Sequence, residues 1–222
     1  MLTQDELAKR TRKARRVWDK RASGYDGSMG FAERRLLGRS HRPWVCRRAT
    51  GLVLEVAVGN GLNLPHYPPE ASVVGVDISR EMLDAARARA DEIGRSVVLA
   101  EADAHRLPFG NNTFDAVVCT YSLCNIPDVE RALDEMNRVL RPDGRLLLVD
   151  HVSSTARPIR WIQRLVELVT VPLEGEHMTR RPFDQVKERF ELEERERMHA
   201  GVVERLVARK AAPVPEQDAR KG

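Results

Sequence analysis

Short apolar runs alternate with amphipathic stretches between residues 52 and 149, and this alternation limits the possible fold more than any other feature of the chain. Ser79 and Asp128 are good helix N-caps, and each precedes apolar residues at helical spacing; we expect the second helix to stop at Pro142. Strands that alternate with helices predict an α/β fold with a mostly parallel, Rossmann-like sheet and helices on both faces. The runs with the length of buried strands are 52–57, 73–76, 97–100, 114–120 and 146–149.

The segments on either side of this core predict further elements. Thr3 opens a capping box for a first helix, and residues 31–48 predict a second helix. Residues 158–170 predict a helix that is apolar almost all round, so it is buried, covers an apolar ligand or touches a membrane. Residues 190–197 and 202–209 predict two strands of a C-terminal antiparallel hairpin, which brings the sheet to seven strands.

A basic cluster lies near the start of the chain, where eight Lys or Arg residues fall between residues 9 and 21. The whole chain of 222 residues has a formal net charge of only +4, so this cluster is a local feature. Such a cluster is either a solvated helix face or a surface for the phosphates of nucleic acid or lipid headgroups. An anionic membrane surface is the partner that we consider for residues 9–21.

The cysteines and the apolar runs limit the compartment in which the protein works. The three cysteines are odd in number and form no C-x-x-C pair, so we expect no disulfide framework and no metal site. No apolar run approaches the roughly 18–20 residues that a membrane span needs. The N-terminus is polar and basic, so we expect no secretory signal and a cytoplasmic location.

The first apolar run ends in a glycine-containing loop, Glu55-Val56-Ala57-Val58-Gly59-Asn60-Gly61, which predicts a close approach of a ligand to the backbone. A P-loop would need a lysine after its last glycine, and none follows Gly61. A dinucleotide fingerprint would need a third glycine where the chain has Leu64. Glu55 would repel a pyrophosphate, but it would attract a cationic amino acid moiety such as that of S-adenosylmethionine.

Two acidic residues mark the ends of the next two predicted strands. Asp77 lies 22 residues after Glu55, which is the offset of a carboxylate that binds ribose hydroxyls at the tip of a second strand. Asp103 follows the third strand, where an adenine ring would lie, and it could accept a hydrogen bond from the exocyclic amine. Each signal is weak alone, but their order at consecutive strand ends predicts a site for a nucleoside-containing cofactor.

These motifs resemble those of the class I S-adenosylmethionine-dependent methyltransferases, and the resemblance covers roughly residues 23–210. Glu55, Gly59 and Gly61 match the first motif of the family, whereas Asp77 matches its ribose-binding acid and Asp103 its adenine-side acid. The resemblance implies an S-adenosylmethionine site formed by Glu55, Ala57, Gly59, Gly61, Asn63, Asp77, Ile78, Met82, Asp103, Ala104 and Thr120.

The resemblance also implies a division of the chain and has one departure. We expect a helical cap segment in residues 1–48, a methyltransferase domain in residues 49–210 and a disordered tail in residues 211–222. Ala57 stands where the family has the first glycine of its loop motif. Because alanine tolerates ordinary strand dihedrals, we expect Ala57 to adopt them and the loop still to bind the cofactor.

The acceptor side of the site is less well defined by the sequence. Tyr25-Asp26 resembles methyltransferases of the ubiquinone/menaquinone type, whereas residues 62–67 and 175–180 are similar to phospholipid N-methyltransferases and thiol S-methyltransferases. Methyl transfer from a sulfonium needs alignment and exclusion of water more than a strong base, so we expect no catalytic triad. The catalytic candidates are His151, His177 and Tyr25.

The function that we predict is transfer of a methyl group to a small, apolar acceptor by in-line displacement. One alternative is a phospholipid N-methyltransferase that works at a membrane surface, docked through residues 9–21, and another is a non-catalytic S-adenosylmethionine-binding regulatory protein. Residues 120–123 read Thr-Tyr-Ser-Leu, not the Asn/Asp-Pro-Pro-aromatic tetrad of RNA and DNA amino-methyltransferases, so we do not expect nucleic acid as a partner. A monomer and a homodimer both fit the sequence.

Overall fold

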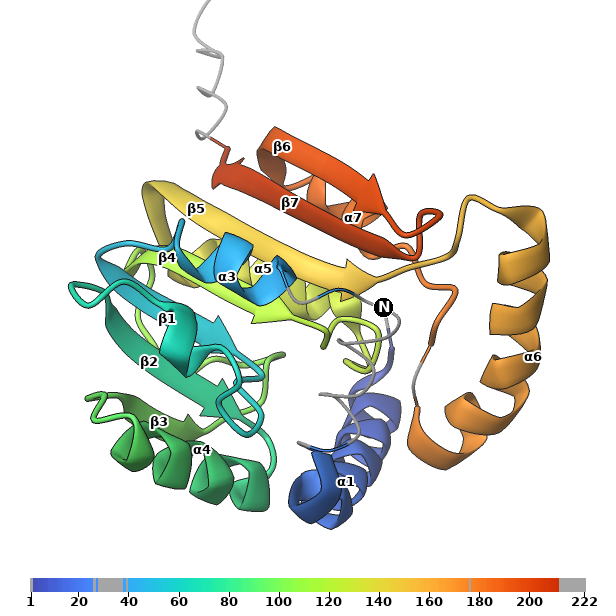
Figure 1. Ribbon diagram of the computed structural model, residues 1–222, viewed down its shortest axis with the longest axis horizontal. Coiled ribbons are helices and arrows are strands. Elements are labelled where there is room, and N and C mark those ends of the chain that lie inside the picture. Colours follow the sequence, from blue (N-terminus) through green and yellow to red (C-terminus); the bar gives the residue numbers. More distant parts are fainter. Residues whose placement is uncertain (1, 26, 28–37, 39, 176, 212–222) are drawn as a thin grey trace, which may run out of the picture.

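A seven-stranded sheet runs through the structure, a computed structural model that describes residues 2–25, 27, 38, 40–175 and 177–211 (Figure 1). Its order is β3-β2-β1-β4-β5-β7-β6. Strands β1 to β5 pair in parallel, whereas β7 is antiparallel to both β5 and β6. The strands are β1 (Leu52–Val56), β2 (Ser72–Asp77), β3 (Val98–Glu101), β4 (Phe114–Thr120), β5 (Leu140–His151), β6 (Phe190–Met198) and β7 (Val203–Lys210). This arrangement confirms the predicted sheet and its C-terminal hairpin.

Helices cover both faces of the sheet, as predicted. On one face, α5 (Val129–Val139) and α7 (Phe183–Val186) pack against the core that contains Phe114 and Leu148. On the other face, α3 (His41–Cys46), the short helix η3 (Leu64–His66) and Ala90 of α4 (Arg80–Glu92) pack against Val53 and Val118. Because both faces are covered, the central strands are almost continuously apolar.

The strand order reverses beside β1, and this reversal determines where a ligand can bind. From β1 the chain runs to β2 and β3 on one side, and it then crosses to β4 and β5 on the other side. The two crossovers leave β1 and β4 in different directions, which opens a crevice beyond their carboxyl ends. The loops after β1, β2, β3 and β4 therefore meet at one edge of the sheet (Figure 1).

Two predicted boundaries differ from the structure. Helix α5 ends at Val139 and not at Pro142, and β5 begins at once with Leu140, which pairs with Phe114. Arg141 precedes a proline, which disfavours helical dihedrals, so the chain turns into a bulge before the pairing resumes at Arg145. Within the predicted helix 31–48, the structure describes α3, while residues 31–37 and 39 lie outside the described part.

The N-terminal segment crosses the carboxyl edge of the sheet. Helix α1 (Gln4–Arg21) begins with the predicted capping box, in which the Thr3 side chain accepts from the Glu6 amide. Near its other end, the hydroxyl of Ser79 donates to Asp19 at 2.7 Å, and Arg15 pairs with Glu101. These contacts attach α1 to the strand ends. The division into segments 1–48 and 49–210 stays a prediction, and residues 212–222 lie outside the described part.

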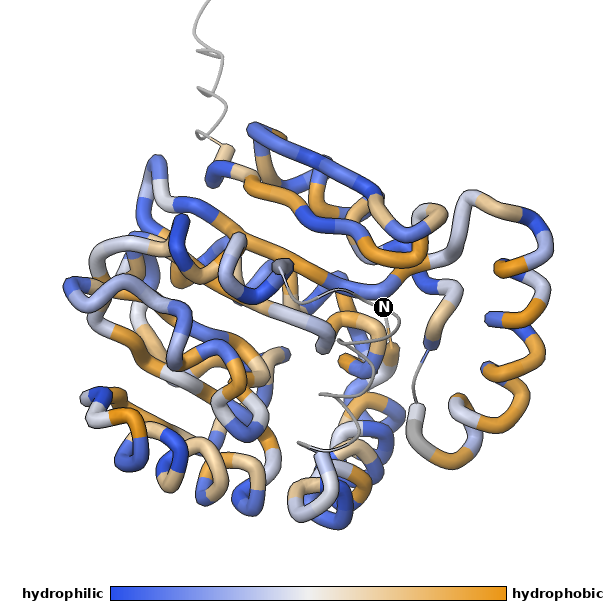
Figure 2. Tube along the Cα trace, viewed as in Figure 1, coloured by the Kyte–Doolittle hydropathy of each residue, from blue (hydrophilic) through white to orange (hydrophobic). Residues whose placement is uncertain are grey.

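Helix α6 (Arg157–Glu174) is longer than predicted and stands beside the body of the molecule (Figure 1), and much of it is hydrophobic (Figure 2). Leu168 is 71% exposed and Trp161 is 63% exposed, so the helix is not a buried one. Among the helices that the structure describes, none is both long and apolar enough to cross a membrane.

Candidate functional site

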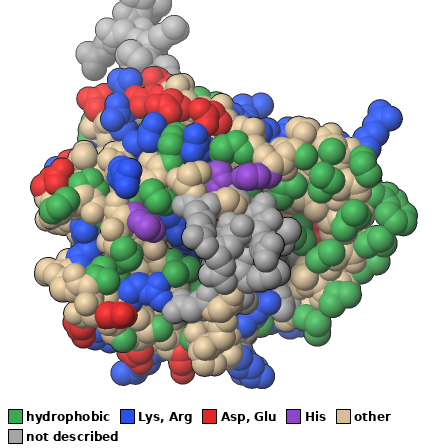
Figure 3. Space-filling view, in the orientation of Figure 1, with side chains coloured by type: hydrophobic (Ala, Val, Ile, Leu, Met, Phe, Trp, Pro, Cys, Tyr) green, Lys and Arg blue, Asp and Glu red, His purple; other side chains and the backbone are tan. Residues whose placement is uncertain are grey.

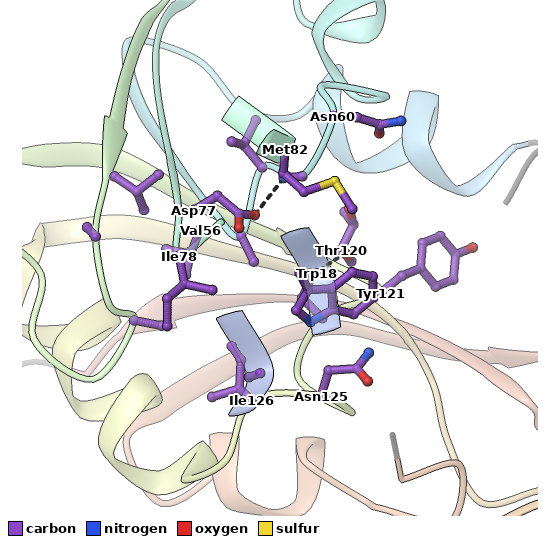
Figure 4. Close-up of a pocket in the computed structure, with 18 of the residues that line it drawn as sticks. Trp18, Val56, Asn60, Asp77, Ile78, Met82, Thr120, Tyr121, Asn125 and Ile126 are labelled. Atoms are coloured by element: carbon purple, nitrogen blue, oxygen red, sulfur yellow. Dashed lines mark hydrogen bonds between the residues drawn. The ribbon is translucent and has the colours of Figure 1, made fainter. Parts of the chain in front are cut away.

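A cavity of roughly 840 Å³, its open mouth included, lies at the carboxyl edge of the sheet. Its walls are the loop after β1, the ends of β2, β3 and β4, and one side of α1. Figure 4 shows Ile78 and Tyr121 on opposite sides of Trp18, with Asp77 and Met82 beside the loop. Its size and its mainly apolar lining with a few polar groups are typical of a cofactor site.

The loop after β1 turns sharply, and Ala57 is the residue that turns it. Ala57 has a φ of 56°, in the left-handed region, so the expectation of ordinary strand dihedrals is wrong. The turn follows directly on β1 and lets the amide of Val58 donate to Val76 at 2.9 Å. Gly61 has a φ of 78°, and a Cβ there would lie 2.8 Å from Leu64, so this position also requires glycine.

Asp77 connects the tip of β2 to this loop. Its carboxylate accepts from the amides of Gly59 and Ser79, both at 2.9 Å, and it lines the cavity. Burial raises the pKa of Asp77 to about 6, although these amides act to lower it. Two backbone bonds use part of the four lone-pair directions of a carboxylate, so Asp77 has the capacity to accept from a ligand as well.

Asp103, at the end of β3, belongs to a hydrogen-bonded chain that includes His105. Asp103 accepts from the His105 amide at 2.9 Å and contacts its Nδ1, and these bonds lower the pKa of Asp103 although burial opposes them. The Nε2 atom of His105 accepts from the Asp128 amide at 3.2 Å. The ring therefore carries its proton on Nδ1, and its orientation is determined at both ends.

A buried polar network lies behind the loop and includes three of the predicted site residues, Glu55, Asn63 and Thr120. Glu55 accepts from Asn63 Nδ2 and from the Tyr67 hydroxyl, both at 2.8 Å. Arg42 donates to Asn63 Oδ1 at 2.9 Å and to Thr120 Oγ1 at 3.1 Å. Burial raises the pKa of Glu55 to about 7, against the opposing effects of Tyr67, Arg42 and Asn63. Glu55 and Asn63 thus position Arg42 and Thr120, which line the cavity themselves.

Aromatic residues from the N-terminal segment form part of the cavity wall. Trp18 of α1 and Tyr25, which follows η1 (Ala22–Gly24), contact each other edge to face with centroids 5.7 Å apart. Both line the cavity, as does Ala14 one turn before Trp18. Asp26, the second residue of the Tyr25-Asp26 pair, lies outside the described residues.

The two histidine candidates lie behind the cavity wall. His151, at the end of β5, has Nδ1 3.5 Å from Asp150 Oδ1 and 3.9 Å from Cys124 Sγ. His177 follows α6, and its amide donates to the Cys124 carbonyl at 3.1 Å; burial and then Arg180 lower the pKa of its ring. Both histidines therefore approach the residue next to Asn125, which lines the cavity.

Cys124, Asp150 and His151 form the one group in the described residues whose side chains could together hold a metal ion. All three are buried, and the Asp150 carboxylate accepts from the amides of Cys124 and His151. Burial raises the pKa of Asp150. The two backbone bonds fix the orientation of the carboxylate, and the three side chains form a packed polar cluster at the end of β5.

The structure divides the predicted residues into two sets. One set lines the cavity and comprises Tyr25, Ala57, Gly59, Asp77, Ile78, Met82, Asp103, Ala104 and Thr120. The other lies behind its wall and comprises Glu55, Gly61, Asn63, His151 and His177. The sequence did not point to Arg42 or His105, which also line the cavity; His105 had the clearer signal, because it stands two residues after Asp103.

Comparison with known proteins agrees with this geometry. Residues 54–148 match the family model described as a methyltransferase domain. The chain is 40% identical over 116 residues to a phosphatidylethanolamine N-methyltransferase of Cereibacter sphaeroides, covering 51% of this chain and 57% of that protein. It is 42% identical over 106 residues to a demethylmenaquinone methyltransferase of Thermus thermophilus, covering 46% of this chain and 48% of that protein.

Among solved structures, the YcgJ protein of Bacillus subtilis superposes with a TM-score of 0.59 at 27% identity, covering 71% of this chain and 70% of that one. The chain spans about half the length of the curated relatives it matches. The strand order, the cavity at the switch point and these matches lead to one conclusion. Residues 54–148 form a methyltransferase domain, and the fold and the relatives of the chain are those of class I S-adenosylmethionine-dependent methyltransferases.

Proposed function

We propose that this chain transfers a methyl group from S-adenosylmethionine to a small, apolar acceptor. The observation that carries the proposal is the distribution of charge along the cavity. A carboxylate lies at the tip of β2, apolar side chains lie beyond it, and the Arg42 guanidinium lies by the loop after β1. S-adenosylmethionine has complementary groups in the same order, since an adenosine is joined to a charged amino acid moiety.

The residues of the cavity fit the cofactor in three parts. Asp77 would accept from the ribose hydroxyls while it keeps the Gly59 amide. Ile78, Met82 and Ala104 would enclose the adenine, and Asp103 would accept from its amine. Arg42 would pair with the carboxylate of the amino acid moiety, because it is the one Lys or Arg among the described residues that line the cavity.

In this proposal Glu55 does not contact the cofactor and instead positions other residues of the site. Both of its oxygens accept from protein groups, and Arg42 is one of the causes that oppose the rise in the pKa of Glu55. Glu55 holds Asn63, and Asn63 in turn accepts from Arg42, so the guanidinium is kept in place at the cavity to meet an anionic group. In this way Glu55 acts as a positioning residue.

When bound, S-adenosylmethionine supplies a methyl group on a positively charged sulfur, which is already activated for displacement. The protein then has to hold an acceptor atom in line with that bond and to exclude water. Trp18 and Tyr25, which line the cavity from the N-terminal segment, would help to exclude water. Asn125 and Tyr121, after β4, lie where an acceptor would be oriented, with His151 and His177 directly behind them as candidates to take a proton.

The apolar character of the proposed acceptor is supported by the lining of the cavity and by the names of the relatives. One relative is named for phosphatidylethanolamine and another for demethylmenaquinone, and both of these acceptors have large apolar parts. The first also supports the alternative of a phospholipid N-methyltransferase working at a membrane surface through residues 9–21. A non-catalytic S-adenosylmethionine-binding protein is the remaining alternative.

Two measurements test the proposal. Titration calorimetry with S-adenosylmethionine should show binding to the wild-type protein, and no heat of binding would refute the cofactor site. Incubation with cofactor and lipid or aqueous cell extracts, followed by mass spectrometry, should reveal a product heavier by one methylene group. Binding without any such product in either extract would favour the regulatory protein over the enzyme.

A further inference from the structure

Helix α6 presents its polar side to the protein and its apolar side to the surroundings. Gln163 is its buried residue; its side chain donates to the Val152 carbonyl at 2.9 Å and accepts from the Ser154 amide at 2.8 Å. One turn later, Glu167 accepts from the amide and the hydroxyl of Thr179, both at 2.7 Å. These polar contacts attach the helix and determine which side faces outward.

The outward side is a continuous apolar surface, which we call the α6 apolar face. Figure 3 shows apolar side chains gathered over this helix. The exposed fractions of its members run from 38% to 71%, although they are large hydrophobic side chains. A contiguous exposed apolar surface of this kind marks an interaction site. The members are Trp161, Ile162, Leu165, Val166, Leu168, Val169 and Leu173.

The charges around this face are positive. Arg157 and Arg164 are exposed and lie along one edge of the α6 apolar face at helical spacing. Glu167 is the one acidic side chain that the structure describes on the helix, and it points toward the protein. The basic helix α1 is adjacent, because Lys13 Nζ donates to the Pro172 carbonyl.

We propose that the α6 apolar face docks on an anionic membrane surface, with the helix lying in the plane of the interface. The apolar side chains would enter the boundary between headgroups and acyl chains, and the arginines would meet lipid phosphates. Trp161 lies on the face itself, and tryptophan prefers this boundary. Pairing of two copies would bring two cationic edges into one interface, whereas an anionic surface offers the opposite charge.

This inference stands apart from the proposed methyl transfer, because none of its residues holds the cofactor. The two are connected through α1, which contacts α6 at Lys13 and lines the cavity with the next residue, Ala14. Docking through α6 would therefore place that wall of the cavity close to the lipid.

Vesicle flotation of the full chain tests the proposal. The wild-type protein should bind vesicles of phosphatidylcholine mixed with phosphatidylglycerol, and it should bind pure phosphatidylcholine more weakly. Leu168→Glu should lower the affinity about ten-fold or more, since it places a charge in the apolar boundary. The double change Arg157→Gln and Arg164→Gln should lower it about thirty-fold on the anionic vesicles alone.

Val98→Glu is the matched control, because Val98 is 63% exposed on β3, at the opposite edge of the sheet from α6. It adds the same charge, and it should leave vesicle binding unchanged. Equal binding by Leu168→Glu and Val98→Glu, or no binding by the wild type, would overturn the proposal. A concentration-dependent dimer that Leu168→Glu abolishes, with no binding to vesicles, would instead assign the face to a second copy.

The same variants separate this inference from the proposed function. Leu168→Glu should retain the wild-type affinity for S-adenosylmethionine by calorimetry, which also shows that it is folded. If the wild type binds vesicles but no S-adenosylmethionine, the cofactor proposal fails and the docking proposal stands. If it binds S-adenosylmethionine but no vesicles, the reverse holds.

Discussion

Ala57 holds a left-handed backbone conformation in the middle of the proposed cofactor loop, so Ala57→Gly should stabilise the protein. An alanine at a φ of 56° is strained by about 1–2 kcal/mol, because its Cβ approaches the neighbouring carbonyl. Glycine removes this strain, but it adds freedom to the unfolded chain that costs about 0.4–1 kcal/mol. The difference is a gain of about 0.5–1 kcal/mol in the free energy of unfolding. For a chain of this size, that gain raises the melting temperature by about 1–4 °C.

Differential scanning calorimetry of three glycine variants tests whether release of backbone strain causes this gain in stability. Ala200→Gly should also stabilise, because Ala200 has a φ of 54° in the exposed hairpin turn, away from the cavity. Ala100→Gly should destabilise by at least about 0.5–1 kcal/mol, because Ala100 lies within strand β3, where glycine adds an entropic cost and removes a methyl group that packs against the core. If Ala57→Gly destabilised the protein as much as Ala100→Gly does, the assignment of backbone strain to the loop would be refuted.

Three further changes examine the site. Asp77→Ala should weaken S-adenosylmethionine binding by about 1.5–3 kcal/mol in calorimetry, and an unchanged affinity would remove Asp77 from the ribose site. Because burial raises the pKa of Asp77 to about 6 and the ionised form accepts from hydroxyls, wild-type affinity should fall as the pH drops through 6; a flat profile would contradict this. Arg42→Met should weaken S-adenosylmethionine binding by about 1.5–3 kcal/mol. If Arg42 pairs with the carboxylate of the cofactor, an S-adenosylmethionine analogue that lacks this carboxylate should bind the wild type and the variant equally. Gly61→Ala should lower the unfolding free energy by about 1–3 kcal/mol in denaturant titration, because its Cβ would meet Leu64 and Ala86; a neutral result would mean that the loop shifts freely.

The core of the fold could be predicted because its signals are local. Each strand from β1 to β5 is a short apolar run, and Ser79 and Asp128 cap the helices that follow two of them. The positions of Asp77 and Asp103 follow from the same pattern, since the residue after a parallel strand must lie at the carboxyl edge of the sheet. Their side chains line the cavity for this reason.

The parts that could not be predicted depend on contacts between distant residues. The pattern of the first motif includes Glu55, but only the fold shows that Asn63 and Tyr67 occupy both of its oxygens. Arg42 lies in a segment without a motif, and it reaches the cavity because α3 packs beside β4. The dihedrals of Ala57 follow from closure of the loop onto β2, which overrides the preference of alanine itself.

The sequence pattern of helix α6 predicts the helix correctly, but it does not predict which side of the helix faces the protein. Gln163, Glu167 and Thr170 are spaced by four and three residues, so they form one polar stripe, which lies beside the arginines of the helix. On a surface helix such a stripe ordinarily faces water and the apolar side faces the core. Here Gln163 and Glu167 meet backbone groups of residues 152–154 and 178–179, so the stripe faces inward. The polar side of the helix is bonded to the protein, so its apolar side is left exposed to the surroundings. The arginines along the edge of this apolar side favour an anionic partner.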